Sequence, residues 1–249
     1  MTGAVSMQNP DNKTVSALPD NRLPGIYGKL PAHGDFVDRG LSVTFIKLWD
    51  QWLQQAFAGS REVLGDDWLT TYLTSPIWRF VQSEGVIDGH AWAGILVPSV
   101  DSVGRYFPLT IAMPLQSNER PASFLAENTD LFTFWESTAM QALQESLNAD
   151  ALSKQLNDSA SALTHSTEPA GRHTLVQGQA VSLNTTAPWA RLLDAQMSQQ
   201  DHSYTLWSCT GSCCMPPMLL QTRGLPDPRK YTAMLNGQWQ TLGWSTSQG

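Results

Sequence analysis

The chain has 249 residues, of which 41% are hydrophobic and 15% are charged. A chain of this length buries about 70% of its unfolded surface when it folds, so it builds a full core without metal or disulfide cross-links. Its 22 acidic and 15 basic residues give a net charge of −7. This charge excludes the broadly basic surface that is typical of proteins that bind nucleic acids.

Membrane and secreted classes are also disfavoured. The longest apolar run, residues 91–97, is far shorter than the ~20 residues of a membrane-spanning helix. The N-terminal 20 residues lack the basic patch and apolar core of a signal peptide. Three cysteines, at positions 209, 213 and 214, are odd in number and close together, unlike a secreted disulfide framework. We therefore expect a cytoplasmic globular protein that does not insert into a membrane.

The N-terminal segment differs in composition from the rest of the chain. Residues 1–23 are rich in Asn, Ser, Thr, Asp and Pro without periodicity, which predicts a disordered polar tail. Residues 24–249 are expected to form a single α/β domain. Glycines and prolines interrupt residues 25–40 so often that this segment predicts a short strand and loops rather than a helix.

Apolar residues at intervals of three and four predict the helices. Ser42 is the expected N-cap of the first helix, which should end at about Ala58 because Gly59 follows it. The clearest helical pattern begins at Thr129 and runs to Leu147. Small polar residues predict a weak linker over 149–174, in which a frayed helix runs into a loop. Further helices are expected at residues 67–73, 188–197 and 226–235.

Runs of aromatic and β-branched residues predict the strands. Residues 77–81, 91–97 and 106–115 are such runs, separated by Gly, Asp and Ser, and they predict an antiparallel meander. The run at 91–97 is apolar on both alternations, which indicates a central strand covered on both faces. Three further short strands are expected at residues 204–209, 218–222 and 238–242. The C-terminal part of the chain is therefore expected to complete one sheet.

Two short motifs in the first loop suggest chemistry but lack the remaining groups. Gly28 and Lys29 resemble a phosphate-binding loop, but Leu30 stands where a Ser or Thr would hold magnesium. His33 and Asp35 flank a glycine and could act as acid and base, yet no nucleophile motif accompanies them. An aspartate in a glycine turn more often accepts hydrogen bonds from nearby backbone N–H groups. Both motifs are more simply read as structural.

Two other clusters contain residues that could bind a metal ion or a partner. Cys209, Cys213 and Cys214 lack a fourth ligand at zinc-site spacing, so they are interpreted as small residues at a strand–turn–strand junction. Asp101 and Arg105 flank Gly104 between two apolar runs, where they could close the turn as an ion pair or form a polar recognition loop. We expect no metal, no cofactor and no catalytic constellation.

Several ordered motifs together resemble one protein family. They are GIYGKLPAHGDF at 25–36, WDQWL at 49–53, YLTSPIWRF at 72–80, WAGILVPSVD at 92–101 and GRYFPL at 104–109. In this combination and order they resemble the TagF (ImpM-like) family, which is associated with bacterial type VI secretion. The C-terminal segment around Trp207 resembles the end of the family pattern, although Ser208 stands where a second tryptophan is usual. The resemblance covers about residues 24–240.

This resemblance implies a regulator rather than an enzyme. Members of the family are post-translational negative regulators of type VI secretion, thought to bind and sequester its forkhead-associated (Fha) scaffold protein. They act beside, or independently of, a threonine kinase and a PP2C-type phosphatase. The implied fold is a three-layer α/β/α sandwich around a mixed, largely antiparallel sheet.

Two glycine- and proline-rich loops carry the family-like motifs and supply the candidate partner-binding residues. These are Lys29, Asp35, Phe36 and Arg39 in the first loop, with Asp101, Arg105 and Tyr106 in the second. The same residues could instead only shape the fold. Two other functions stay open: an accessory structural component of the secretion apparatus, and a hydrolase that uses His33 and Asp35.

Overall fold

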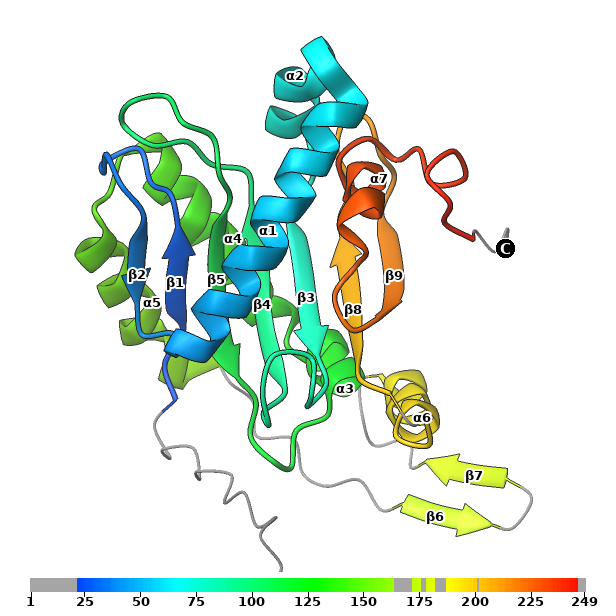
Figure 1. Cartoon of the computed structure of the whole chain (residues 1–249). Helices are drawn as coiled ribbons and strands as arrows, with labels where there is room; N and C mark the ends of the chain where they lie inside the picture. The colour runs from blue at the N-terminus through cyan, green and yellow to red at the C-terminus, as the bar shows by residue number, and fades with distance from the viewer. Residues whose placement is uncertain (1–21, 164–171, 176–177, 182–186, 201, 246–249) are drawn as a thin grey trace, which may run out of the picture.

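The computed structural model describes residues 22–163, 172–175, 178–181, 187–200 and 202–245 (Figure 1). Its centre is a seven-stranded sheet with the strand order β2-β1-β5-β4-β3-β8-β9. A separate hairpin pairs β6 (Arg172–Leu175) with β7 (Gly178–Val181). The sheet strands are β1 (Gly25–Gly28), β2 (Val37–Arg39), β3 (Trp78–Gln82), β4 (Trp92–Val97), β5 (Leu109–Pro114), β8 (Tyr204–Cys209) and β9 (Met218–Arg223).

Every strand pairing in the described part of the sheet is antiparallel. The expectation of a mixed sheet is corrected to this extent. The meander β3-β4-β5 is confirmed, with Ile95 opposite Arg79 on one side and opposite Ile111 on the other. β4 is the middle strand and is buried along its whole length, as its uninterrupted apolar sequence predicts.

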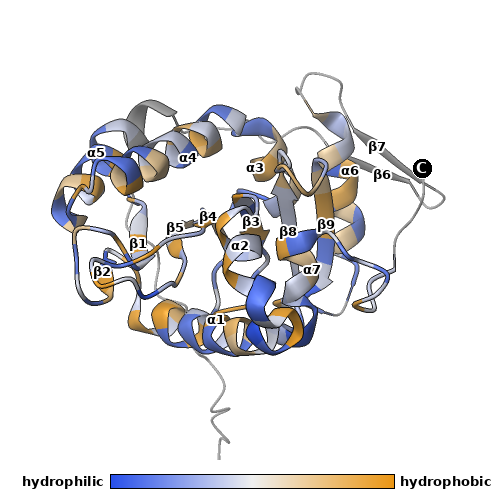
Figure 2. Cartoon of the chain, turned by 90° about the horizontal axis from the view of Figure 1, so that it is seen from above, coloured by the Kyte–Doolittle hydropathy of each residue, from blue (hydrophilic) through white to orange (hydrophobic). Residues whose placement is uncertain are grey.

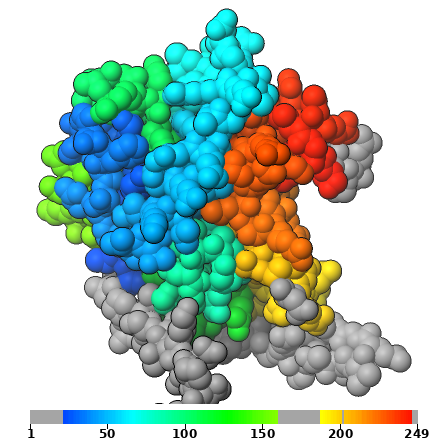
Figure 3. All heavy atoms as spheres, viewed as in Figure 1, coloured from blue at the N-terminus to red at the C-terminus, as the bar shows by residue number. Residues whose placement is uncertain are grey.

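Helices cover both faces of this sheet, so the predicted three-layer α/β/α sandwich is confirmed (Figure 2). One face carries α1, α2 and α7, and the other carries α3, α4, α5 and α6. Figure 3 shows α1 crossing the first face with the C-terminal segment beside it. The helices are α1 (Val43–Leu64), α2 (Trp68–Leu73), α3 (Pro121–Glu127), α4 (Thr129–Gln144), α5 (Ala149–Leu163), α6 (Pro188–Met197) and α7 (Tyr231–Asn236).

The layer beneath α1 is dominated by tryptophan. Trp49 is fully buried, stacks on Trp207 at 6.1 Å between ring centroids, and donates its indole N–H to Thr110 Oγ1 at 2.8 Å. Trp52 and Trp78 donate theirs to backbone carbonyl groups of the C-terminal segment. Because a buried indole N–H needs an acceptor, these bonds fix the C-terminal segment against α1 and β3.

The first helix is longer than expected. Ser42 caps it by accepting a hydrogen bond from Phe45 N, as predicted, but the helix continues through Gly59 to Leu64. Gly59 as its stop was wrong: at this point α1 packs against the C-terminal segment at Pro228, and the helix ends at Leu64. Tertiary packing of this kind overrides the cost of about 1 kcal/mol that a glycine carries inside a helix.

Several other boundaries differ from the predictions. The helix expected from Thr129 ends at Gln144 rather than near Leu147. The strand expected at 106–115 begins only at Leu109, because the preceding residues belong to the loop. The helix expected over 226–235 is a 3-10 turn, η2 (Pro228–Lys230), followed by α7.

The strand expected at 238–242 was wrong. This segment forms turns in which Leu242 N bonds to Trp239 O at 3.2 Å, and the Trp239 ring packs on Trp78 and Trp244. Trp239, the aromatic residue of this segment, therefore makes ring contacts rather than pairing in a strand.

The segment from 149 onward begins with a helix. α5 spans Ala149–Leu163 and buries Ala149, Leu152 and Leu156 against the sheet, while part of the expected linker lies outside the described residues. Residues 1–21 of the expected tail also lie outside them, and Arg22, the last but one residue of that tail, forms an ion pair with buried Glu119.

Candidate partner-binding surface

The two loops singled out by the sequence lie side by side at one end of the strands of the sheet (Figure 1). Residues 29–36 join β1 to β2, and residues 98–108 join β4 to β5. β1 pairs directly with β5, so the first loop begins where the second one ends. We call these two segments together the two-loop surface.

Gly28 makes this close approach possible. Its φ is +134°, and a Cβ at this position would lie 2.0 Å from the carbonyl oxygen of Pro108. Only glycine fits both the backbone conformation and the space. The first loop therefore starts in direct backbone contact with the second.

Asp101 is the buried centre of the surface. Its carboxylate accepts hydrogen bonds from Lys29 Nζ, from Arg105 Nε at 2.7 Å, and from the backbone N–H groups of Val103 and Arg105 at 3.0 and 2.8 Å. Burial by itself raises the pKa of Asp101, but the hydrogen bonds from Lys29 and Arg105 outweigh it and hold the pKa below its usual value. The turn-closing ion pair weighed from the sequence is thus present, with Lys29 as an additional partner.

This pKa shift predicts a specific acid sensitivity. Because the pKa of Asp101 is lower in the folded than in the unfolded chain, its stabilising effect is complete above the unfolded value of about 3.9 and is lost as the pH falls further. Asp101→Asn should therefore be less stable than the wild type at neutral pH, and the difference should shrink below about pH 4. Urea unfolding of both proteins over this range measures it, and a constant difference would contradict the assignment.

Further hydrogen bonds fix the second loop to Tyr72 of α2 and to the first loop. The Tyr72 hydroxyl donates to Ser99 O at 3.0 Å and accepts from Ser99 N at 2.7 Å, and Ser99 Oγ donates to Lys29 O at 2.6 Å. Ser102 N donates to His33 O at 2.9 Å, and Arg105 Nη2 donates to the carbonyl oxygen of Gly34. The two loops consequently form one hydrogen-bonded unit.

An aromatic group borders this unit. The Phe36 ring stacks on Tyr27 at 5.8 Å and meets the edge of Phe107 at 4.9 Å, while Lys29 Nζ lies 4.8 Å from its centroid. Phe36 is nevertheless 44% exposed. It is a firmly positioned apolar side chain that faces solvent.

The structure separates the predicted site residues into three groups. Lys29 and Asp101 are buried and support the surface from below. Asp35, Phe36 and Arg105 are exposed on it, and Val103, which the sequence analysis did not single out, is 67% exposed beside them.

The last two candidates lie apart from this exposed group. Tyr106 is half-buried and packs edge-on against Trp68 and Tyr72. Arg39 lies at the far end of β2 and pairs with Asp150 of α5 at 2.7 Å. The structure therefore does not bring Arg39 together with the two loops.

His33 and Asp35, the residues of the hydrolase alternative, each bond elsewhere. His33 Nε2 accepts the backbone N–H of Ala149 at the start of α5 at 2.9 Å. Asp35 Oδ1 accepts the backbone N–H of Phe36 at 2.8 Å, as expected for an aspartate in a glycine turn.

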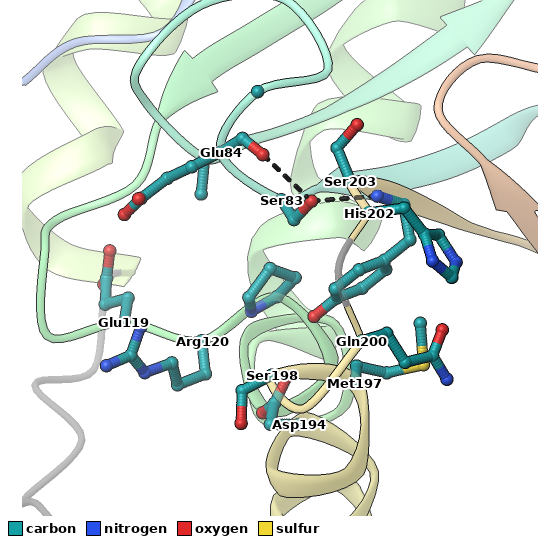
Figure 4. A pocket seen from close by; sticks show the side chains of 14 residues that line it. Ser83, Glu84, Glu119, Arg120, Asp194, Met197, Ser198, Gln200, His202 and Ser203 are labelled. Atoms are coloured by element: carbon teal, nitrogen blue, oxygen red, sulfur yellow. Dashed lines mark hydrogen bonds between the residues drawn. The ribbon is translucent and has the colours of Figure 1, made fainter.

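A pocket of about 510 Å³ lies at the opposite end of the strands and was not predicted (Figure 4). Its lining comes from the β3–β4 loop, α3, α6 and the start of β8, segments whose meeting leaves no local sequence signal. Asp194 in its wall accepts the backbone N–H groups of Ala122 and Ser123, both at 2.8 Å, and so joins α6 to the start of α3. Burial raises the pKa of Asp194 despite the hydrogen bonds from Ser123.

The comparisons with known proteins bear on the chain as a whole. Residues 25–159 match the family model described as the TagF N-terminal domain, type VI secretion system-associated. The chain belongs to the TagF family. The matched span runs from β1 into α5 and includes both loops of the two-loop surface.

A solved structure extends the similarity of this TagF-family chain. The crystal structure of PA0076 from Pseudomonas aeruginosa PAO1 matches this chain with a TM-score of 0.71, and the two sequences are 33% identical. The alignment covers 86% of this chain and 94% of that chain. This coverage exceeds the span of the family model, so the likeness includes part of the C-terminal region. The search of curated proteins found no match.

Two further observations concern only the residues that the structure describes. None of their helices is long and apolar enough to cross a membrane. Nor do they contain a cluster of three or more His, Cys, Asp or Glu side chains placed to hold a metal ion.

Proposed function

We propose that this chain is a cytoplasmic negative regulator of bacterial type VI secretion that binds the Fha scaffold protein and withholds it from assembly of the apparatus. Membership of the TagF family associates the chain with type VI secretion. The regulatory role and the scaffold partner come from the family resemblance of the sequence. The net charge of −7 suits a protein partner better than a nucleic acid.

The two-loop surface supports this proposal because it presents exposed side chains on a fixed base. Phe36 and Arg105 are of the residue types that are enriched in protein–protein interfaces. The Arg105 side chain is 57% exposed although its Nε is held by Asp101, and Phe36 is held by ring contacts. Little conformational entropy is lost when such pre-positioned groups bind.

Regulation by the kinase and phosphatase pathway is a separate part of the proposal. We expect scaffold binding to be independent of threonine phosphorylation, so that repression works beside that pathway.

The residues of the two-loop surface have two roles in this proposal. Lys29 and Asp101 support the surface from inside the protein, while Asp35, Phe36 and Arg105 contact the partner.

Phe36→Ala tests the surface directly. We expect it to weaken scaffold binding at least about 10-fold, or about 1.4 kcal/mol, because it removes an exposed aromatic side chain without unpairing a buried charge. In a strain lacking the native gene, the variant should fail to restore repression, measured as type VI substrates secreted into the medium.

A matched control is Arg229→Ala, which removes an exposed arginine from η2, in the C-terminal segment. This variant should repress like the wild type. Thermal unfolding of both variants checks that they are folded. Full repression by folded Phe36→Ala would exclude the two-loop surface as the partner site.

A further inference from the structure

The turn between β8 and β9 places two thiols together on the surface. Ser212 N donates to Met215 O at 2.8 Å, which closes a tight turn with Cys213 and Cys214 as its two central residues. Both cysteines are exposed, and their Sγ atoms are 3.3 Å apart. Successive side chains of an extended strand point to opposite faces, so it is the turn that brings these thiols together.

The exposed pair differs from the third cysteine. Cys209 is buried, and burial raises the pKa of its thiol, which makes it unreactive. In the pair, the hydrogen bond between the two sulfurs and the charge of Cys213 raise the pKa of Cys214. The pair is thus exposed and internally hydrogen-bonded, whereas Cys209 is shielded from oxidants.

The β8–β9 turn, which carries the thiol pair, lies at the same end of the strands as the two-loop surface but towards the opposite edge of the sheet (Figure 1). Cys214 lies beside the side chain of Thr74, immediately after α2. Two residues earlier, Tyr72 holds both backbone groups of Ser99 at the base of the second loop. A continuous path of contacts thus runs from the thiol pair to the base of that loop.

We propose that Cys213 and Cys214 form a redox-active dithiol that closes reversibly into a disulfide by exchange with a small-molecule disulfide. The thiolate of one cysteine attacks one sulfur of the oxidant, which forms a mixed disulfide and releases one thiol. The other cysteine then loses its proton and attacks the sulfur of the first cysteine, which releases the second thiol. Two electrons and two protons pass from the chain to the oxidant, which leaves as two thiols.

Covalent geometry explains why such a disulfide is easily reduced. Adjacent Cα atoms are 3.8 Å apart across a trans peptide, closer than the 4.4–6.8 Å usual for disulfide-linked residues. Strained and exposed disulfides have more oxidising potentials and are the labile, regulatory ones. The pair is thereby suited to report the thiol–disulfide balance of its surroundings rather than to stabilise the fold.

Mass spectrometry of the full chain tests the proposal. After incubation with oxidised glutathione, we expect a species that has lost two hydrogen atoms, with the bond mapped between residues 213 and 214 and reversed by dithiothreitol. Cys209→Ser should behave like the wild type, whereas Cys213→Ser should stop at a glutathione adduct on Cys214 or remain unreacted. Glutathione adducts on both thiols of the wild type, disulfide-linked dimers, or thiols that stay reduced would each overturn the proposal.

An effect of oxidation on scaffold binding would rest on the proposed function and is measured separately. Reduced and oxidised wild type should differ in affinity for the scaffold, while the Cys213→Ser, Cys214→Ser double variant should not respond to the oxidant. If neither the reduced nor the oxidised chain binds the scaffold, the proposed function is contradicted. The thiol chemistry is then judged from the mass spectra alone. Equal affinities in both states would show that the thiol pair does not control this surface.

Discussion

Replacing Trp49 by alanine is expected to lower the free energy of unfolding by about 3–5 kcal/mol. The indole is fully buried, packs against the rings of Phe45, Trp52, Phe80 and Trp207, and donates to Thr110 Oγ1 of β5. Truncation would leave a large cavity and an unpaired hydroxyl between α1 and the sheet. Equilibrium unfolding in urea measures the change.

Trp189→Ala is the matched control, because this tryptophan also lies in a helix but is 55% exposed. It should change stability by less than about 0.5 kcal/mol. Comparable losses in the two variants would contradict the description of an aromatic core layer beneath α1.

Gly28→Ala is expected to destabilise the chain by about 3 kcal/mol or more and to abolish scaffold binding. The added Cβ would lie 2.0 Å from Pro108 O at a φ of +134°, so strain and steric overlap act together. Relief requires the first loop to move away from the second, which would separate Lys29 from Asp101. Urea unfolding and titration with the scaffold measure the two effects.

Gly104→Ala is the control that separates the backbone strain of a positive φ from the steric overlap that is expected at Gly28. Its φ is +83°, but no atom lies within 4 Å of the added Cβ, so only the conformational cost of about 1–2 kcal/mol applies. Equal effects of the two substitutions would show that the close approach of the loops does not matter.

Most of the fold could be predicted from local sequence patterns. The apolar run of β4, the three- and four-residue spacing in α1 and the Ser42 cap each depend on near neighbours. The errors arose where distant contacts decide the conformation. α1 continues through Gly59, where it packs against η2, and Trp239 packs on Trp78 of β3 in a segment expected to be a strand.

The candidate site was predicted in part. The sequence indicated that two glycine- and proline-rich loops could lie together, and the structure brings Lys29 and Asp101 into contact across 72 positions. Which residues are buried and which face solvent could not be predicted, because a lysine or an aspartate in a loop is usually solvated. The role of Tyr72, which lies on a helix far from both loops in sequence, left no signal in their motifs.

The central claim is that this TagF-family chain binds the Fha scaffold directly and independently of phosphorylation. Titration calorimetry of the purified chain against the scaffold, phosphorylated and unphosphorylated, tests it most directly. We predict a dissociation constant of about 1 μM or tighter, near −8 kcal/mol, that is the same for both forms. Binding to one form alone would make the chain a reader of the kinase pathway, and no binding to either form would contradict sequestration.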